Sequence, residues 1–441
     1  MNVFFVSLGC DKNLVDSEHM LAVLSENGAK IVDDEHEADV IVINTCSFIL
    51  DAKEESINTI IEMAEMKKSG KCKVLVVTGC LAQRYEDEIK AQLPEVDVIL
   101  GINGIEEIFA VANEALSTGK PVYEVFEPAG LPDTSAGRIV TTGGHYAYLK
   151  IAEGCDKHCT YCAIPSIRGK YRSVVMEELV AEAKNLAESG VKELILVAQE
   201  TTVYGTDIYG KKKLPELVNR LSEIDGIEWI RILYCYPEEI DEAFVDMMAN
   251  NKKVCHYIDM PIQHCSNEIL GRMGRRTSKA DILEKIAMLR SAMPDIAIRT
   301  SLICGFPGET KSQHKEMLDF VKKVSFDRLG VFTYSQEENT PAASFKNQVW
   351  NSTKKRRRDA IMKLQEQLMI EKCNELKDSE VMCFIEGEIP ADNVYVGRTF
   401  RDAPDVDGLI FIDRTVPLMS GDIVKCRIKG AKGIDLLGEI I

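Results

Sequence analysis

Three cysteines, Cys155, Cys159 and Cys162, lie close together in the stretch EGCDKHCTYCAIPSIRG (153–169). Cysteine thiolates bind zinc ions and iron–sulfur clusters, and both usually take four protein ligands. A C-x-x-x-C-x-x-C loop is compact enough to ligate three irons of one cubane cluster, which leaves the fourth iron with an open coordination position. Because substrates bind at the open positions of catalytic metal centres, this spacing predicts a reactive cluster.

Two alternatives compete with a cluster in this loop. The first is a structural zinc ion with His158 or a remote residue as fourth ligand, but His158 directly precedes Cys159, which is an awkward geometry for one tetrahedral ion. The second is three unrelated buried thiols. Six other cysteines show no mutual spacing and are interpreted as core or surface thiols: Cys235, Cys255, Cys304, Cys373, Cys383 and Cys426.

A second group of cysteines ends three apolar runs, with Cys10 in SLGC, Cys46 in INTC and Cys80 in VTGC. In a parallel sheet the carboxyl ends of the strands share one edge, where doubly wound folds bind ligands. We therefore expect these three thiols to converge and to hold a second iron–sulfur cluster with one open iron. The alternative is that they are small apolar residues closing a buried sheet, which is the interpretation for Cys72.

The elements that must position both groups indicate the α/β fold class. Residues 1–120 alternate apolar runs with amphipathic helical patterns, which is typical of a doubly wound domain. Those runs are 2–10, 38–46, 72–80 and 96–101. Residues 121–144 are rich in Pro, Gly, Ser and Thr without a sustained period, so we interpret them as a linker.

The alternation of strands and helices restarts in residues 145–352 and continues for six units, which predicts an open partial TIM barrel. The candidate strands are 147–154, 191–200, 227–235, 254–263, 295–306 and 327–335. The first cysteine group directly follows the first strand, at the end where α/β barrels place their chemistry. A connecting helix is expected over 353–377, and the short alternating runs of 378–441 predict a small OB-like β-barrel of about five strands.

The overall composition narrows the class of protein further. The chain has 441 residues, 45% of them hydrophobic, with a net charge of −17 and 14 cysteines. No apolar run is long enough to span a membrane, and the start MNVFFVSLGC lacks the basic region of a signal peptide, so we expect a cytoplasmic protein without a membrane partner. Cytoplasmic cysteines favour metal binding over disulfides. The acidic balance argues against a nucleic-acid backbone as the main partner.

The C-x-x-x-C-x-x-C loop after the first strand of a six-unit barrel resembles the radical S-adenosylmethionine enzymes. The resemblance implies a 4Fe-4S cluster whose fourth iron is chelated by the amino and carboxylate groups of S-adenosylmethionine, and a reductive cleavage that yields a 5′-deoxyadenosyl radical. It also implies residues near this cosubstrate, each of which has a structural role as its alternative: Tyr161 beside the adenine, Gln199 and Glu200 at the second strand, and Arg299, Ser301 and the Gly305 backbone at the fifth strand.

Two incompletely ligated clusters in one chain resemble the methylthiotransferases, which combine a three-cysteine N-terminal domain, a radical barrel and a C-terminal TRAM β-barrel. The resemblance implies two 4Fe-4S clusters and S-adenosylmethionine as cosubstrate, used once as methyl donor and once as radical source. It also implies a reducing electron donor. No residue can be assigned to proton transfer from the sequence. A non-catalytic iron–sulfur carrier is a rival interpretation, although carriers normally complete the coordination of their clusters.

Several motifs resemble the branch of this family that modifies an aspartate of ribosomal protein S-twelve, whereas the tRNA branch starts with a YGCQMN-like motif. They are SLGCDKNLVDSE (7–18), AEGCDKHCTYCAIP (152–165), QETTVYG (199–205) and GRTFRDAPDVDG (397–408), with Glu200 where the branch usually has Asp. The resemblance implies methylthiolation of the aspartate β-carbon, in the free protein or in the small ribosomal subunit.

Charge supports the same substrate. Residues 376–441 contain 8 Lys and Arg against 12 Asp and Glu, which suits a basic ribosomal protein better than tRNA phosphates. Methylthiolation of a tRNA adenosine remains the alternative, and the basic run KKRRR (354–358) is the observation that favours it. GFPGETKS (305–312) lacks the Gly-Lys pair of a phosphate-binding loop, so we exclude nucleoside triphosphate binding there.

Overall fold

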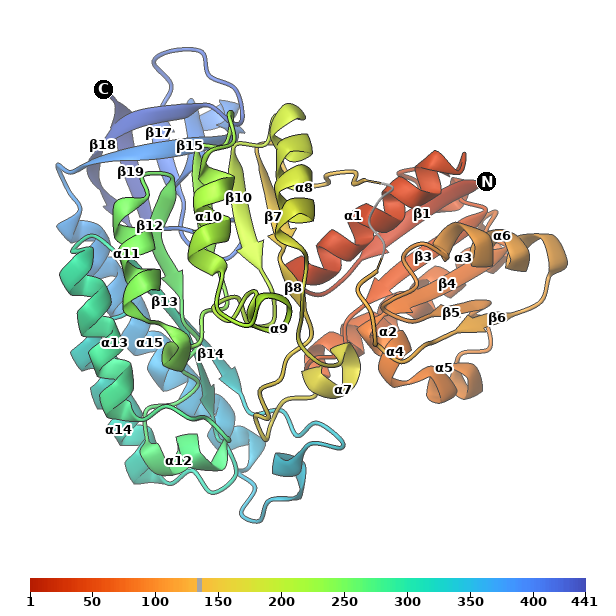
Figure 1. Cartoon of the computed structure of the whole chain (residues 1–441), viewed down its shortest axis with the longest axis horizontal. Coiled ribbons are helices and arrows are strands. Elements are labelled where there is room, and N and C mark those ends of the chain that lie inside the picture. Colours follow the sequence, from red (N-terminus) through yellow and green to blue (C-terminus); the bar gives the residue numbers. More distant parts are fainter. Residues whose placement is uncertain (133–136) are drawn as a thin grey trace.

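The structure is a computed structural model that describes residues 1–132 and 137–441. Figure 1 shows three β-sheet units: an N-terminal α/β unit, a central open sheet covered by helices, and a C-terminal barrel at the far end of the central sheet from the cysteine loop. The mixed α/β class with an open partial barrel and a small closed barrel is confirmed. Residues 133–136, part of the segment interpreted as a linker, lie outside the described residues.

The N-terminal sheet is parallel, with strand order β2-β1-β3-β4-β5-β6. Its strands are β1 (Asn2–Ser7), β2 (Lys30–Ile31), β3 (Val40–Thr45), β4 (Val74–Gly79), β5 (Val98–Leu100) and β6 (Val122–Glu124). All residues of β3 and β4 are buried, because helices cover both faces of the sheet. Strand β6 differs from the interpretation of 121–144 as a linker, since three of those residues pair with β5.

The helices of this unit are α1 (Asp11–Glu26), η1 (Glu35–Glu37), α2 (Leu50–Ala64), α3 (Met66–Ser69), α4 (Cys80–Arg84), α5 (Glu86–Gln92) and α6 (Ile108–Thr118). Apolar side chains of α1 and α6 pack on one face of the sheet, and those of α2, α4 and α5 pack on the other. The carboxyl ends of β1, β3 and β4 are left at one edge, directly before the three N-terminal cysteines.

The central sheet has six parallel strands in the order β14-β13-β12-β11-β10-β7 and stays open, as predicted. Its strands are β7 (Tyr146–Lys150), β10 (Glu193–Val197), β11 (Trp229–Ile232), β12 (Val254–Asp259), β13 (Ala297–Cys304) and β14 (Arg328–Thr333). An antiparallel pair, β8 (Ala152–Glu153) and β9 (Arg172–Ser173), brackets the cysteine loop.

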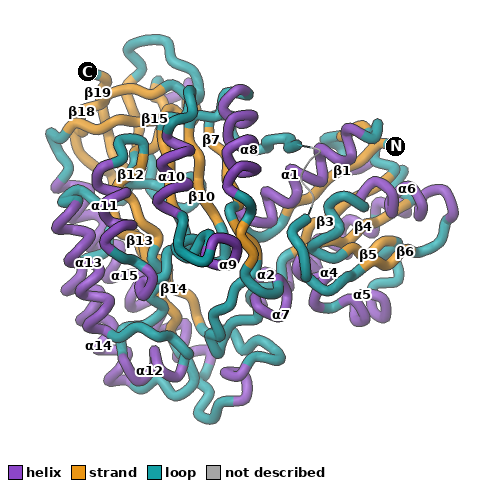
Figure 2. Tube along the Cα trace, viewed as in Figure 1, coloured by secondary structure: helices purple, strands orange, loops and turns teal. Residues whose placement is uncertain are grey.

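Helices cover the outer face of this sheet (Figure 2). They are α8 (Met176–Glu188), α10 (Leu214–Ser222), α11 (Glu242–Asn250), α12 (Asn267–Arg272), α13 (Lys279–Ala292), α14 (Lys311–Val324) and α15 (Asn351–Glu375). The other helices of this unit are α7 (Ile164–Arg168), which lies against the N-terminal unit, α9 (Thr206–Tyr209), η2 (Pro237–Glu239) and η3 (Pro341–Ser344). On the opposite face, Val15 of α1 packs with Tyr146 and Tyr148 of β7, so the N-terminal unit covers part of the open barrel.

The C-terminal barrel closes with five strands in the order β15-β16-β17-β19-β18, as predicted. The strands are β15 (Glu380–Ile389), β16 (Val394–Thr399), β17 (Ile410–Asp413), β18 (Ile423–Lys432) and β19 (Asp435–Ile440), with η4 (Pro390–Asp392) between the first two. The loop from β16 to β17 enters the central sheet, where Ala403 joins the cluster around Tyr146 and Asp407 accepts a hydrogen bond of 2.7 Å from Tyr257. Among the described residues, no helix combines the length and apolar character needed to cross a membrane.

Candidate functional site

The three N-terminal cysteines meet at the carboxyl edge of their sheet. Cys10 directly precedes α1 and is exposed, whereas Cys46 follows β3 and Cys80 begins α4, both buried. Burial, together with the neighbouring Cys80 and Cys10 thiols, raises the pKa of the Cys46 thiol to about 12. The structure thus brings together three residues that are far apart in the sequence, as the strand-end pattern predicts.

Asn13 connects the three segments that carry these thiols. Its amide nitrogen donates to the carbonyls of Leu8, at 3.1 Å, and Thr45, at 2.9 Å. Its Oδ1 lies 3.8 Å from Cys80 Sγ. One buried side chain therefore fixes the turns that follow β1 and β3 relative to the third cysteine. The asparagine is part of the SLGCDKNLVDSE motif, but the sequence does not predict this role.

The barrel cysteines lie in a tight loop between β8 and β9. The backbone N–H of Cys155 donates to Gly169 at 3.1 Å, and that of Cys162 donates to Cys159 at 3.1 Å. Gly154 has φ +77°, and a Cβ there would lie 2.1 Å from the carbonyl oxygen of Lys170, so only glycine fits. Burial raises the pKa of Cys155 to about 11 and of Cys162 to about 12, with contributions from neighbouring thiols.

Metal binding explains why thiols of such high pKa gather at two sites, because a bound cation favours the thiolate. The spacing of the thiols tests the zinc alternative. Two sulfurs on one zinc ion lie at most about 4.6 Å apart, twice the Zn–S distance. In the described part of the chain, only Asp34, Glu35 and His36 bring three candidate donor atoms within 4.8 Å of one another. Neither cysteine group is that compact, whereas each thiolate on a cubane binds a different iron.

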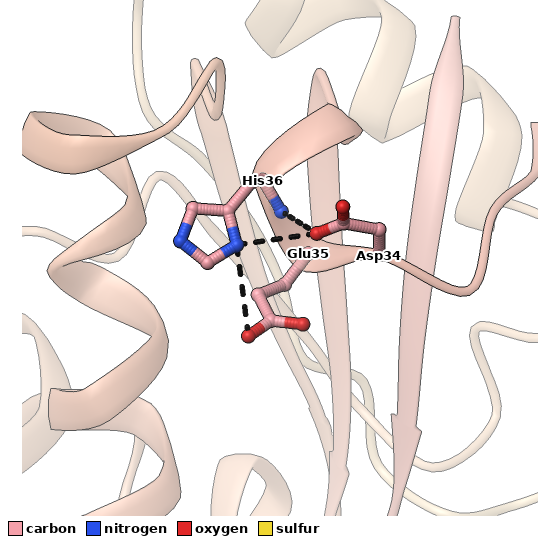
Figure 3. A group of neighbouring side chains, drawn as sticks. All are labelled: Asp34, Glu35 and His36. Atoms are coloured by element: carbon pink, nitrogen blue, oxygen red, sulfur yellow. Dashed lines mark hydrogen bonds and ion pairs between the residues drawn. The ribbon is translucent and has the colours of Figure 1, made fainter.

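The Asp34, Glu35 and His36 group is a helix cap rather than a metal centre (Figure 3). The Asp34 carboxylate accepts hydrogen bonds from the backbone N–H of His36 at 2.9 Å and from its ring Nδ1 at 3.1 Å. These bonds cap the short helix η1, and both side chains are more than half exposed.

Gln199 and Glu200, predicted to bind the cosubstrate, lie next to the barrel cysteines. Gln199 donates to Glu153 at 2.8 Å, but its buried Oε1 has no hydrogen-bond partner among the described residues, and the same holds for Glu200 Oε2. Burial raises the pKa of Glu200 to about 7, although Lys157 lies 3.6 Å away. Two buried acceptors without a hydrogen bond, one of them paired only at 3.6 Å with Lys157, fit a ligand that carries an amino or hydroxyl group.

Tyr161 packs against Phe306, Met273 and Ile269 beside the cysteine loop. Burial raises its pKa, and the Cys159 and Cys162 thiols raise it further. Its ring is therefore next to the barrel cysteines, in an apolar setting that suits stacking on a planar ligand.

The remaining predicted residues lie along β13 and just after it. Arg299 donates to Asp259 at 2.9 Å and faces Asp407 of the C-terminal barrel, so its guanidinium is engaged within the protein. Ser301 is half-buried, and its carbonyl accepts from the Gln263 N–H. Gly305 has φ +74° and lies under the Lys354 side chain.

The sequence does not identify Arg275, which the structure places beside the barrel cysteines. Its guanidinium is buried 4.2 Å from the centre of the Tyr236 ring, and Nη2 donates to the Pro261 carbonyl at 3.0 Å. Nε and Nη1 have no hydrogen-bond partner among the described residues. A buried cation with free donors near Cys159 and Tyr161 fits a ligand carboxylate. Its only sequence signal is its position after the fourth barrel strand.

Comparisons with known proteins place this geometry in a family. Three family models match successive segments: "Uncharacterized protein family UPF0004" over residues 2–101, the Radical SAM superfamily over 149–321 and the TRAM domain over 379–441. The structure of the radical S-adenosylmethionine methyltransferase TsrM from Kitasatospora setae, with cobalamin and a 4Fe-4S cluster bound, aligns with a TM-score of 0.53 over 77% of this chain and 73% of that chain. At 14% identity this likeness concerns the fold alone.

Curated relatives match over their full length. The ribosomal protein uS12 methylthiotransferase RimO of Lachnoclostridium phytofermentans is 54% identical, and the match covers 99% of each chain. The protein of the same name from Acetivibrio thermocellus is 50% identical, over 100% of this chain and 98% of its own. With three matching domains and two sites of three thiols each, this chain belongs to the ribosomal protein uS12 methylthiotransferase (RimO) family.

Proposed function

We propose that this protein methylthiolates the β-carbon of an aspartate in ribosomal protein uS12 by radical S-adenosylmethionine chemistry. The observation that carries the proposal is the presence of two separate sites of three thiols, each at the carboxyl edge of a parallel sheet. The names of its full-length relatives support the substrate.

The reaction explains why two sites are needed. The β-carbon of an aspartate is not acidic enough for a side-chain base to deprotonate at neutral pH. When bound, the two 4Fe-4S clusters and S-adenosylmethionine would supply a hydrogen-abstracting radical together with the sulfur and the methyl group. Cys155, Cys159 and Cys162 would hold one cluster, and the N-terminal group, Cys10, Cys46 and Cys80, would hold the other.

Side chains of the central unit would orient the cosubstrate at the barrel cluster. The unpartnered acceptor atoms of Gln199 and Glu200 would receive hydrogen bonds from its amino group or ribose, and the free donors of Arg275 would bind its carboxylate. Tyr161 would pack against the adenine. Because these groups are buried, binding of the cosubstrate removes water from the place where the radical forms.

Charge favours a basic protein over RNA as the substrate. Part of the basic run 354–358 is committed to contacts within the protein: Lys354 is buried and donates to the Tyr334 carbonyl at 2.8 Å, and Arg357 pairs with the buried Glu309 at 3.1 Å. The run is therefore less available to phosphates than its sequence suggests. We further propose that the protein acts in the cytoplasm, on uS12 alone or in the small subunit, with a separate reducing electron donor.

An anaerobic competition tests the proposal. Reconstituted enzyme, reductant and S-adenosylmethionine are given uS12 and tRNA together, and both are analysed by mass spectrometry. We expect a methylthio group on one aspartate of uS12, absent with Cys155→Ala or Cys10→Ala and retained with Cys72→Ala, a buried cysteine two residues before β4. Modified adenosine with unmodified uS12 would overturn the proposed substrate, and absence of 5′-deoxyadenosine would overturn the radical chemistry.

A further inference from the structure

The side chain of Arg168 extends from the central unit into the N-terminal cysteine site. It is the last residue of α7, which follows the barrel cysteine loop directly, and only 2% of its side chain is exposed. Its Nη2 donates to Cys80 Sγ at 3.5 Å and also to Asn13 Oδ1. Helix α7, which follows Cys162 of the barrel site, therefore places a guanidinium in contact with Cys80 of the N-terminal site.

The second terminal nitrogen of this guanidinium, Nη1, donates hydrogen bonds to carboxylates from both units. Nη1 donates to Asp16 of α1 at 3.0 Å and to Glu153 at 2.8 Å, two residues before Cys155. Lys150 also pairs with both carboxylates, so two cations and two anions balance in a buried cluster. These bonds orient the fork of Arg168 and leave Nη2 directed at Cys80. In the described part of the chain, Lys150 bonds to these carboxylates and not to a thiol, so Arg168 is the cation in contact with Cys80.

A positive charge at a ligand sulfur changes the electron affinity of a cluster. Reduction adds a negative charge, which a nearby cation and a hydrogen bond to sulfur both stabilise, so the reduction potential rises. The effect is stronger in a buried site, where water screens the charge poorly. Cys80 and Arg168 are both buried.

We propose that Arg168 is a positioning residue that orients Cys80 and raises the reduction potential of the N-terminal cluster. The inference rests on the proposed function, because it requires Cys80 to be a cluster ligand. Arg168 makes one site dependent on the other: the chain segment that completes the barrel loop also sets how readily the N-terminal cluster accepts an electron.

The test isolates the N-terminal cluster in the full chain. In a background with Cys155, Cys159 and Cys162 all changed to Ala, iron content is determined and the midpoint potential is measured by a redox titration followed by electron paramagnetic resonance. We expect Arg168→Gln to make reduction about tenfold less favourable, which is a fall of about 59 mV for a one-electron couple. Arg168→Lys keeps the charge and is expected to recover most of this shift.

Arg138 provides the matched control. Its side chain is 3% exposed and also joins the two units, through Glu18 of α1 and Glu182 of α8, but among the described residues it forms no hydrogen bond to either cysteine group. Arg138→Gln is expected to leave the midpoint potential unchanged. If Arg168→Gln is unstable because it leaves buried carboxylates, the double variant Glu153→Gln/Arg168→Gln removes one of them, and its potential is compared with that of Glu153→Gln alone.

The outcomes separate the inference from the proposed function. An unchanged potential in a folded, iron-containing Arg168→Gln variant would overturn the inference alone. Equal potentials in Glu153→Gln and the double variant, or an equal shift in Arg138→Gln, would do the same. Loss of all iron from the triple-alanine background that retains Arg168 would overturn both the second cluster and the inference that depends on it. A fall in potential with recovery by lysine supports the role of Arg168.

Discussion

Arg398 of the C-terminal barrel forms an ion pair with Glu193, the first residue of β10, across the boundary between the two units. Arg398 Nη2 lies 2.5 Å from Glu193 Oε2, and Arg231 of the neighbouring strand β11 occupies the other carboxylate oxygen at 2.8 Å. At most 1% of each of these three side chains is exposed. The contact fixes the C-terminal barrel to the amino-terminal end of the central strands, opposite the end that carries the barrel cysteines.

Replacement of Arg398 should destabilise this junction. Arg398→Met leaves Glu193 with a single cation and leaves Glu386 with His145 alone, so we expect a loss of about 3–5 kcal/mol in the free energy of unfolding. Urea unfolding measures the loss. The control is Lys425→Met, which breaks an exposed pair with Glu380 on the same barrel and should leave the free energy of unfolding almost unchanged. Similar costs for both variants would contradict the prediction.

The free energy of unfolding should decrease as the pH falls below 6.5, because the folded protein buries His264 in its neutral form. Burial, together with the nearby His314 and Arg357, lowers the pKa of His264 from an ordinary value of 6.5 to about 3. The folded state therefore contains the neutral His264 ring. The contribution of this ring to the free energy of unfolding is present above pH 6.5 and is lost as the pH falls toward 3. One proton taken up on unfolding corresponds to about 1.4 kcal/mol per pH unit.

His264→Asn tests this dependence, because its side-chain oxygen can accept the hydrogen bond that the Ser266 N–H donates to His264 Nδ1. Between pH 6 and 4.5, the unfolding free energy of the parent should fall by about 1.4 kcal/mol per pH unit more than that of the variant. Parallel curves for the two proteins over this range would contradict the assignment.

An alanine at Gly154 should prevent the barrel cysteine loop from closing. Its Cβ would lie 2.1 Å from the Lys170 carbonyl, so we expect Gly154→Ala to lose the barrel cluster and the cleavage of S-adenosylmethionine. Gly210→Ala is the matched control, because Gly210 also has a positive φ, +69°, but faces open space. It should cost only about 1–2 kcal/mol in stability and keep its iron. Iron content and 5′-deoxyadenosine formation distinguish the two variants.

Cys80→Ala and Cys155→Ala should have separable effects. Each is expected to lower the iron content by about four atoms per chain, since each removes a ligand of a different 4Fe-4S cluster. Only Cys155→Ala should abolish 5′-deoxyadenosine formation, whereas both should abolish methylthiolation. Cys72→Ala should retain all iron. Loss of iron from Cys72→Ala, or full iron in Cys80→Ala, would argue against the assigned ligands.

Arg275→Met should weaken binding of the cosubstrate. Loss of a charged hydrogen-bond donor to a carboxylate is expected to raise the dissociation constant of S-adenosylmethionine about tenfold or more, because such bonds contribute about 1.5–3 kcal/mol. Equilibrium dialysis with the reconstituted enzyme measures it. Arg290→Met serves as control, since Arg290 donates to the Val324 and Ser325 carbonyls at the end of α14. Unaltered affinity in Arg275→Met would exclude the carboxylate contact.

The sequence by itself determines the fold class and the location of both cysteine groups. Strand and helix periods are local properties, and the carboxyl ends of parallel strands necessarily share an edge, so Cys10, Cys46 and Cys80 could be placed together before any contact was known. The short loop around Cys155 is equally local, because its spacing alone limits which atoms its thiols can reach.

Tertiary structure alone decides the contacts between units. Arg168 meets Cys80, Arg398 meets Glu193 and the loop containing Ala403 enters the central sheet, although each pair is far apart in the chain. The basic run at 354–358 reads as a surface patch in the sequence, yet burial of Lys354 and the ion pair of Arg357 take both into the protein. Such partners depend on how the faces of separate sheets pack, and no local period or spacing encodes that.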